Sequence, residues 1–335
     1  MSQPLIFITG ATGFIGAHVV TQALSAGYHV RLSVRKEAQI SNLRKAFSSH
    51  SANLDFVVVP DFTRPGAFDK ALHGVTYIFH LASPMPGTGD DFQNDYVKPA
   101  VDGTIALLNA AKTVDTIKRV VIVSSILALV PLDALVTGKF TAKEGTKIDI
   151  DPQMSFPADP GAAGGLKYHA SKILAHRATL SWNTSSAPRY SIITLHPSFV
   201  FGANLLQTSP EALDGTNAML WSSLTSPQPL IPMSAVDVRD VAAAHIRALE
   251  VKAEDGEVEE FIVCASEKEG WTWDRVAEFV KQKYEFVGVK LEGPFEQPPS
   301  VDTSKAERVL GFGWRTMEDT VGDFLDHQVE LRGKL

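Results

Sequence analysis

PLIFITGATGFIG, residues 4 to 16, joins an apolar run to three glycines and leads into a segment of helical periodicity. Gly10 would permit a tight turn, Gly13 would let backbone N–H groups approach a pyrophosphate, and Gly16 would allow close packing of helix on strand. The spacing G-x-x-G-x-x-G, with a strand before it and a helix after it, predicts a dinucleotide-binding turn. No Gly-Lys-Ser/Thr follows, which excludes an NTPase phosphate loop. The residues expected to bind the cofactor here are Gly10, Thr12, Gly13, Phe14, Ile15 and Gly16.

Short β-branched runs bounded by Gly, Asp or Pro alternate with helical segments over the first 200 residues. This alternation is typical of a parallel sheet with crossover helices, so we expect an α/β fold with a Rossmann-type doubly wound parallel sheet. Gly27 and Gly74 occupy positions that favour left-handed backbone after a helix. The expected strands are Pro4–Thr9, Tyr28–Val34, Leu54–Pro60, Val75–Leu81, Lys118–Ser124 and Tyr190–His196.

Beyond Gly202 prolines interrupt the pattern, which indicates a smaller C-terminal region. We expect residues 1–200 to form the cofactor-binding domain and residues 201–335 to form mainly a substrate-binding region. Within the latter, residues 237–265 should return to the sheet as a helix over Asp237–Glu250 and a strand over Glu260–Cys264. The irregular stretch Pro131–Gly165 reads as a long loop, and such loops are usually functional.

The composition excludes several classes of protein. With 31 Lys and Arg against 38 Asp and Glu, the chain lacks the basic face that a nucleic-acid partner needs. One cysteine, Cys264, cannot form an internal disulfide. No apolar run is long enough for a signal peptide or a membrane span, so we expect a cytoplasmic protein. The histidines form no spacing typical of a metal site, and no G-x-S-x-G elbow of a hydrolase occurs.

The end of the second strand indicates which nicotinamide cofactor is bound. An acid in this place hydrogen-bonds the ribose 2′-OH of NAD, whereas a cation accommodates the 2′-phosphate of NADP. Here Val34 is followed by Arg35 and Lys36, which supply a planar fork and a point charge suited to a phosphate. The alternative is two solvated charges at a helix start. We favour NADP(H).

Further cofactor contacts are expected at the ends of the third and fourth strands. Asp61, followed by Phe62, could accept a hydrogen bond from the adenine amino group, or could cap a helix entered at Pro65. Leu81, Ala82 and Ser83 end the fourth strand, where small residues would let the cofactor lie close to the backbone.

Tyr168 and Lys172 are the catalytic candidates, because side chains four apart share one face of a helix. An adjacent ammonium and a cationic nicotinamide should lower the phenol pKa and make proton exchange with a substrate oxygen feasible. Ser125, at the end of the fifth strand, could hold that oxygen in line with the phenol. Ser124 is the competing assignment, and a serine that only ends a strand is the alternative to both.

These motifs together resemble the extended short-chain dehydrogenases/reductases, and within them the dihydroflavonol reductase/cinnamoyl-CoA reductase group, including yeast-type carbonyl and methylglyoxal reductases. The resemblance implies that Ser125, rather than Ser124, acts with Tyr168 and Lys172. It also implies that Lys172 bonds the nicotinamide ribose. Family members usually carry glycine at Ser198, and often an aromatic or small residue at Ile126. The residues implied to line the nicotinamide run from Pro197 to Val200 and include Phe199. The segments that carry the resemblance are Thr9–Gly16, Val30–Lys36, Phe79–Ser83, Lys98–Thr104, Val123–Ser125, Tyr168–Lys172, His196–Gly202 and Asp237–Ala242.

We therefore expect an NADPH-dependent reductase that transfers a hydride to the carbonyl of an aldehyde or ketone. Met85 and Ile126, with apolar residues between Leu205 and Leu230, should line the substrate pocket, which favours an aromatic or aliphatic carbonyl over a sugar. The alternatives are an NAD-dependent nucleotide-sugar epimerase or dehydratase and a non-catalytic NADP-sensing protein. No metal is expected, and the protein should be a monomer or a homodimer.

Overall fold

A seven-stranded parallel sheet forms the centre of the structure, a computed structural model that describes residues 3–87, 89–137, 139–265, 268–297, 299–311 and 313–333. The strand order is β10-β7-β5-β4-β1-β2-β3, and every neighbouring pair is parallel. The predicted Rossmann-type fold is confirmed, and each expected strand ends within one or two residues of the observed one. The strands are β1 (Leu5–Thr9), β2 (His29–Val34), β3 (Leu54–Val58), β4 (Tyr77–His80), β5 (Arg119–Val123), β7 (Ser191–Pro197) and β10 (Val258–Val263).

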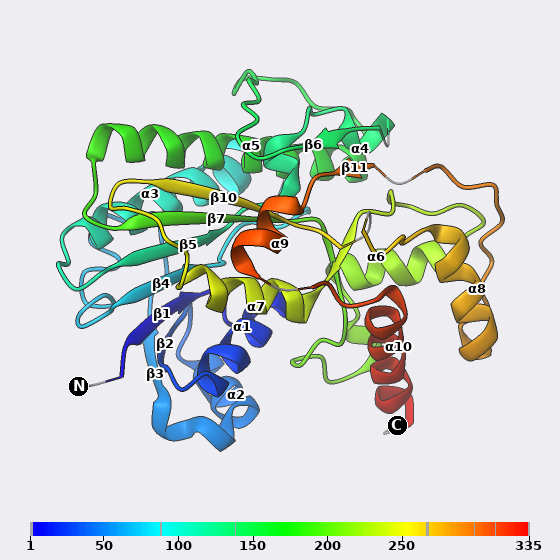
Figure 1. The fold of residues 1–335 in the computed structure, drawn as a ribbon, viewed down its shortest axis with the longest axis horizontal. Helices are drawn as coiled ribbons and strands as arrows, with labels where there is room; N and C mark the ends of the chain where they lie inside the picture. The colour runs from blue at the N-terminus through cyan, green and yellow to red at the C-terminus, as the bar shows by residue number, and fades with distance from the viewer. Residues whose placement is uncertain are drawn as a thin grey trace.

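Helices cover both faces of this sheet (Figure 1). On one face lie α3 (Lys98–Lys112) and α5 (Pro160–Ser186); on the other lie α1 (Phe14–Ser25), α2 (Ala38–Ala46) and α7 (Val238–Ala248). Successive residues of β1 face opposite layers. Ile6 and Ile8 belong to the core that includes α1, whereas Phe7 belongs to the core that includes α3. Burial on both faces explains why the strands read as continuous apolar runs.

The segment between β3 and β4 differs from the expectation. We expected a helix entered at Pro65, but residues 62–74 form a series of turns. Gly66 has φ +74° and Gly74 has φ +72°, and a left-handed residue directly after Pro65 cannot continue a right-handed helix. The prediction of a helix was therefore wrong. The short helical elements elsewhere in this half are η1 (Ser48–Asn53), η2 (Phe92–Val97) and η3 (Ile126–Leu129).

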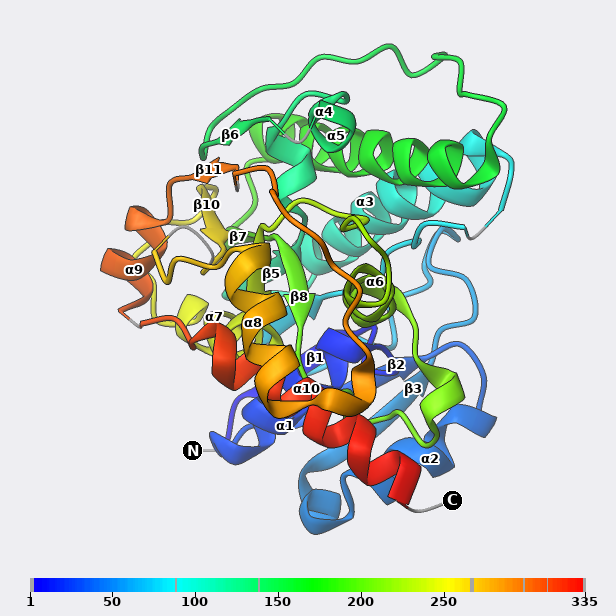
Figure 2. The same cartoon turned by 90° about the vertical axis from the view of Figure 1, so that its right-hand side faces the viewer.

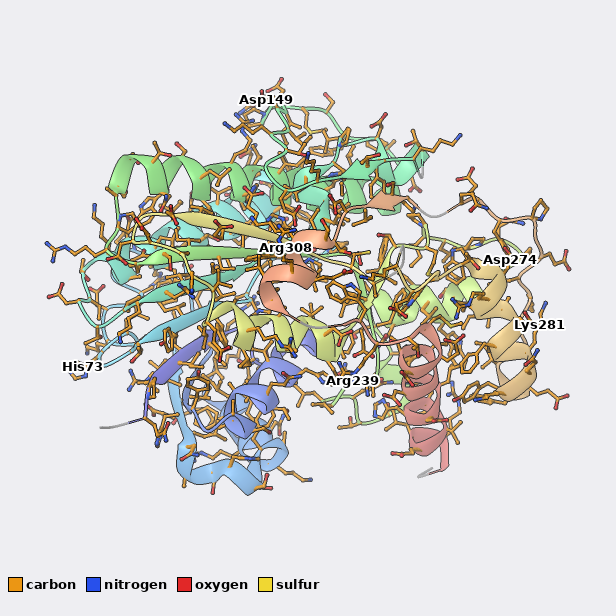
Figure 3. All side chains as sticks on the ribbon, in the orientation of Figure 1. His73, Asp149, Arg239, Asp274, Lys281 and Arg308 are labelled. Atoms are coloured by element: carbon orange, nitrogen blue, oxygen red, sulfur yellow. The ribbon has the colours of Figure 1, made fainter. Side chains whose placement is uncertain are left out.

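The irregular segment after β5 ends earlier than the expected boundary at Gly165. α5 already begins at Pro160, so the glycine-rich run before Gly165 is helical rather than loop. The Asp159 side chain accepts a hydrogen bond from the Ala162 N–H, and proline at the first helical position is favourable. Before α5 the segment contains α4 (Ala134–Thr137) and β6 (Thr141–Ala142), and Figure 3 shows Asp149 at its outermost point.

The C-terminal region lies beyond the carboxyl ends of the central strands, in front of them in Figure 2. β8 continues the chain from the end of β7, and β10 returns to the sheet beside β7. Two short strand pairs lie here: β8 (Phe199–Phe201) pairs with β9 (Ala235–Asp237), and β11 (Ser300–Val301) pairs with β6. The helical elements of this region are η4 (Pro210–Ala212), α6 (Gly215–Leu224), α8 (Trp273–Lys283), η5 (Glu285–Val287), α9 (Ser304–Leu310) and α10 (Met317–Gly333).

A buried carboxylate at the start of α7 joins this helix to α10. Asp237, fully buried before α7, accepts hydrogen bonds from the Arg239 guanidinium and from the Thr320 hydroxyl of α10 at 2.9 Å. Arg239 also pairs with Asp323 of α10, and Figure 3 shows it between α7 and that helix. The hydrogen bonds to Asp237 raise the pKa of Arg239.

None of the helices within the described ranges is both long and apolar enough to span a bilayer.

Gly16→Ala should destabilise the fold, because a Cβ at this position would lie 2.1 Å from the Gly10 carbonyl oxygen, and that backbone atom cannot easily move. We expect a loss of about 1–3 kcal/mol in the free energy of unfolding, measured by urea denaturation. The control is Gly103→Ala in α3, whose Cβ would lie an ordinary 3.7 Å from Phe62. That variant should gain roughly 0.5–1 kcal/mol. Equal stability of both variants would contradict the close-packing argument.

Candidate active site

The glycine-rich turn brings the ends of two strands and the start of one helix into contact. Gly10 has φ +77°, and a Cβ there would lie 2.8 Å from the Ala82 nitrogen at the end of β4. Gly16 sits against the Gly10 carbonyl, as described above. Gly13 has more room, with only that carbonyl oxygen 3.4 Å from its Cβ position. Gly10 and Gly16 are therefore required by packing, whereas a side chain at position 13 would meet only the Gly10 carbonyl oxygen.

The N-terminus of α1 has the properties of an anion site. Gly13 is its N-cap, no side chain caps it, and its first turn, which includes Phe14 and Ile15, carries no acidic residue. The first N–H groups of a helix have no partner inside the helix and sit at the positive end of its dipole. The preceding turn contains Thr12, an exposed residue. This geometry fits the pyrophosphate of a dinucleotide.

A buried hydrogen-bond network joins β1 to β4 beneath this turn. The Thr9 hydroxyl accepts the Leu81 and Ala82 N–H groups at 3.2 and 3.1 Å and lies 2.9 Å from His80 Nδ1. His80 Nε2 lies 3.2 Å from the Thr104 hydroxyl of α3, which itself donates to a helix carbonyl. The network requires a neutral His80 with its proton on Nε2. Burial, and then the nearby Lys172 ammonium, lower the pKa of His80 to about 4.

Arg35 and Lys36 lie at the carboxyl end of β2, directly after the buried Val34. Gln39 fixes this turn, because its side-chain oxygen accepts the Arg35 and Lys36 N–H groups at 2.9 and 3.1 Å. Both cationic side chains are exposed, and neither has an ion-pair partner among the residues that the structure describes. Their charges are therefore available to a ligand at this edge of the sheet.

Asp61 forms a local turn after β3. One carboxylate oxygen accepts both the N–H and the hydroxyl of Thr63, at 2.9 and 2.7 Å, and the other accepts Arg64 Nε. The two bonds from Thr63 lower the pKa of Asp61. Asp61 therefore caps a turn rather than the expected helix. Its contact with adenine stays a prediction, as does that of Phe62, whose ring packs against Phe68 at 5.4 Å.

Ser125, Tyr168 and Lys172 come together at the carboxyl end of β5. The Ser125 side chain accepts the Leu127 N–H at 3.2 Å and is hydrogen-bonded to the Tyr168 phenol. Lys172 Nζ lies 5.4 Å from the centre of the Tyr168 ring. The neighbouring Ser124 lines a cavity instead, together with Lys172, Ala82 and Ser83. Ser125, not Ser124, is therefore the serine beside the phenol.

The electrostatics of this triad differ from the expectation. Burial raises the pKa of Tyr168 to about 12, and the Ser125 hydrogen bond offsets this only in part. The lowering of the phenol pKa expected with a cationic nicotinamide is not seen in the chain by itself, where desolvation is the largest effect. The same burial lowers the pKa of Lys172 to about 8. At neutral pH the phenol carries its proton and can act as an acid.

The first residues of the C-terminal region follow the carboxyl end of β7, at the same edge of the sheet. Pro197 ends β7, and Phe199 and Val200 lie in β8, the first partly and the second fully buried. Ser198, between the two strands, is buried, and its hydroxyl has no partner among the described residues. A nicotinamide ring carries a carboxamide that could satisfy such a hydroxyl. The resemblance implies glycine at this position in most relatives, and a contact of Ser198 with the cofactor stays a prediction.

The two expected substrate residues differ in exposure. Met85, on the loop after β4, is 49% exposed and free to contact a ligand. Ile126 is only 4% exposed and belongs to a core cluster on which Tyr168 packs. Their contact with substrate stays a prediction.

Sequence reasoning missed two buried residues behind Lys172. His176, one turn further along α5, lies 3.5 Å from the Glu260 carboxylate of β10. His176 could have been found from its helical spacing to Lys172. Glu260 could not, since only the pairing of β10 with β7 brings it there.

Comparison with known proteins gives consistent matches over the whole chain. The model of the NAD dependent epimerase/dehydratase family matches residues 6–264. The ketoreductase sphI of Aspergillus fumigatus is 39% identical over 99% of both chains. Gre2 from Candida albicans, solved in complex with NADPH, is 28% identical with a TM-score of 0.79, over 98% of this chain and 99% of that one. Yeast methylglyoxal/isovaleraldehyde reductase Gre2, also complexed with NADPH, is 26% identical with a TM-score of 0.76, over 99% of this chain and 100% of that one.

Acid should destabilise the protein through its buried histidines. Burial lowers the pKa of His80 and His245 to about 4 from an ordinary 6.5. Between those values the unfolded chain binds protons that the folded chain does not, so the free energy of unfolding falls as pH falls, by up to about 1.4 kcal/mol per unit for each residue. Urea denaturation from pH 7 to 4.5 should show that His245→Leu reduces this slope. An unchanged slope would contradict the assignment of His245 as a buried neutral group.

Proposed function

The chain belongs to the NAD dependent epimerase/dehydratase family of extended short-chain dehydrogenases/reductases and is an oxidoreductase, and we propose that it is an NADPH-dependent reductase of a ketone or aldehyde. The family resemblance predicted from the motifs is confirmed. The observation that carries the proposal is the hydrogen-bonded Ser125 and Tyr168 beside Lys172, at the edge of the sheet where the glycine-rich turn also lies.

In the proposed mechanism the chain positions a carbonyl and supplies a proton. A bound nicotinamide cofactor provides the hydride that is transferred to the carbonyl carbon. The Ser125 hydroxyl holds the carbonyl oxygen, and Tyr168 donates its proton to that oxygen as negative charge develops there. The raised pKa of Tyr168 suits this role, because the phenol remains protonated until the oxygen becomes the stronger base. Lys172 stabilises the resulting phenolate and would hold the ribose.

The cofactor would be held by the chain's own turns. The N-terminus of α1 would bind the pyrophosphate, and Arg35 with Lys36 would bind a 2′-phosphate. Leu81, Ala82 and Ser83, all partly buried at the end of β4, would lie along the cofactor. The similar proteins solved with NADPH support this choice of cofactor.

An epimerase or dehydratase is the second candidate, because the family description names these reactions. Against it stands the end of β2, where Val34 and Arg35 replace the acid that binds the ribose of NAD. The names of the similar proteins, a ketoreductase and a methylglyoxal/isovaleraldehyde reductase, also favour carbonyl reduction.

The substrate proposed is an aromatic or aliphatic carbonyl compound. Leu205, Leu230 and Met85 are large apolar side chains that remain 48%, 61% and 49% exposed. Exposed apolar side chains suit an apolar ligand better than a nucleotide sugar, which needs many polar partners. Leu220 is instead fully buried and belongs to the core.

Tyr168→Phe should reduce kcat for NADPH-dependent carbonyl reduction by at least about 100-fold, because it removes the proton donor. The dissociation constant of NADPH should stay close to that of the wild type. Tyr190→Phe is the matched control: it removes a buried phenol that bonds the Leu108 carbonyl at 3.0 Å, and it should affect stability but not kcat. Wild-type turnover by Tyr168→Phe would overturn the assignment.

Arg35→Asp should weaken NADPH binding by roughly 10–100-fold, the value of one or two charge-assisted hydrogen bonds, with a much smaller effect on NADH. Titration of protein fluorescence with each cofactor measures both affinities. Arg189→Asp makes the same charge change at an exposed position before β7 and should leave the preference unchanged. Equal losses for NADPH and NADH in Arg35→Asp would argue against recognition of the 2′-phosphate.

A further inference from the structure

Three buried ionisable residues lie together behind the proposed catalytic triad. His176 of α5, His196 of β7 and Glu260 of β10 have ligand atoms within 4.8 Å of one another. His176 Nε2 is 3.5 Å from Glu260 Oε1, and the two imidazole rings are perpendicular with their centres 4.8 Å apart. The mechanism proposed above uses neither His176 nor Glu260. Burial of such groups is costly unless they are paired, so their presence calls for an explanation.

A metal ion does not explain the cluster well. Two histidines and a glutamate are a donor set that zinc accepts. However, both nitrogens of His196 are already engaged, Nδ1 with the Ser125 carbonyl at 3.1 Å and Nε2 with the Thr194 hydroxyl at 2.9 Å. A metal would have to break one of these bonds. His196 is therefore built to hold the backbone of Ser125 rather than to ligate an ion.

His176 differs from His196 in having unused capacity. It is 5% exposed; its Nε2 faces the Glu260 carboxylate at 3.5 Å, too long for a good hydrogen bond, and its Nδ1 has no hydrogen-bond partner among the described residues. A buried imidazole in this state requires a further partner. One side of the ring faces Glu260, and the residue also lines a cavity.

That cavity connects His176 to Lys172. It has a volume of about 20 Å³, enough for one water molecule. Lys172 and His176 are four residues apart on α5 and both line it, so their polar ends share one helix face. A water needs two to four polar partners, and the lining supplies them. The other polar residues of the lining are His80, Ser83, Thr104, Ser124, Thr179 and Thr194.

Glu260 connects the same cluster to the surface. It lies on the edge strand β10, its side chain is 11% exposed, and its second oxygen accepts the Gly145 N–H at 2.9 Å. Although burial opposes ionisation, His176 and the Gly145 N–H hold the pKa of Glu260 at about 2. A permanent carboxylate thus stands between His176 and solvent. The other titratable groups around His176 are Lys172 and His80 at the cavity and His196 beside it.

We propose that His176 and Glu260 form a proton path that resupplies Lys172, and through it Tyr168, after each reduction. The inference rests on the proposed function. In each turnover the Tyr168 O–H bond breaks and the product O–H bond forms. The phenolate then regains a proton from the side of Lys172, Lys172 regains one from the cavity water, and the water regains one from His176. One solvent proton then reaches His176 past the Glu260 carboxylate, which keeps its charge, and no electrons move along the path.

The test compares His176→Gln with the wild type under conditions of saturating NADPH and carbonyl substrate. Glutamine keeps a polar side chain but cannot carry a proton, so kcat should fall about 10-fold, within the range of general acid–base effects. The solvent isotope effect on kcat in D₂O should rise, and the primary isotope effect with C4-deuterated NADPH should fall towards one. Added imidazole buffer should restore the rate in a concentration-dependent manner.

Two further variants complete the design. Glu260→Gln should reproduce the changes of His176→Gln, because it removes the carboxylate that faces His176 Nε2 at 3.5 Å. His245→Gln removes a buried imidazole of α7 that lies outside the cluster and the cavity lining, and it should keep wild-type isotope effects. The dissociation constant of NADPH should be the same in all three variants.

The outcomes are distinct. The proton path is refuted if His176→Gln keeps wild-type kcat and isotope effects, or if kcat falls with unchanged isotope effects and no rescue by buffer, which would indicate a structural role. If the wild type itself shows no NADPH-dependent carbonyl reduction, the proposed function fails, and the proton path fails with it.

Discussion

The close approach of α1 to β1 is the constraint on which the site depends. Gly16 has no space for a side chain because the Gly10 carbonyl lies against it. Gly10 has no space for a side chain because the backbone after β4 lies against it. Three backbone segments therefore meet without a side chain between them. The contact places the uncapped N-terminus of α1 at the carboxyl edge of the sheet. Since all seven strands are parallel, the residues after β2, β4, β5 and β7 end on that same edge.

Burial then sets the protonation states at this edge. Desolvation disfavours charge, so it raises the pKa of Tyr168 to about 12 and lowers that of Lys172 to about 8. The same effect keeps His80 neutral, in the only form that can bridge the Thr9 and Thr104 hydroxyls as observed. A protonated phenol beside an ammonium that gives up its proton readily suits proton donation to a carbonyl oxygen. It also makes resupply of that proton a separate problem, which the buried His176 and Glu260 are placed to solve.

Much of this arrangement could be predicted from local sequence, and the errors have physical causes. The strands were found because burial on both faces leaves continuous apolar runs, and the glycine turn was found because its spacing has a steric reason. The prediction of a helix at Pro65 was wrong because Gly66 adopts a left-handed conformation. The prediction that the loop extends to Gly165 was wrong, because Asp159 and Pro160 start α5 before the glycine-rich run. In the chain by itself the pKa of Tyr168 is raised rather than lowered, because burial removes water from the phenol and the sequence does not show that burial.

The sequence by itself determined the sheet, the glycine turn, the cations after β2 and the helical pair Tyr168 and Lys172, because each depends on residues close together in the chain. The choice of Ser125 over Ser124 was implied by the family resemblance, and the structure places Ser125 beside the phenol. Only the tertiary structure decided that Ser198 is buried with no partner among the described residues and that Glu260 lies beside His176. Those relations join residues from separate strands and helices. They follow from strand order and burial, which no local pattern encodes.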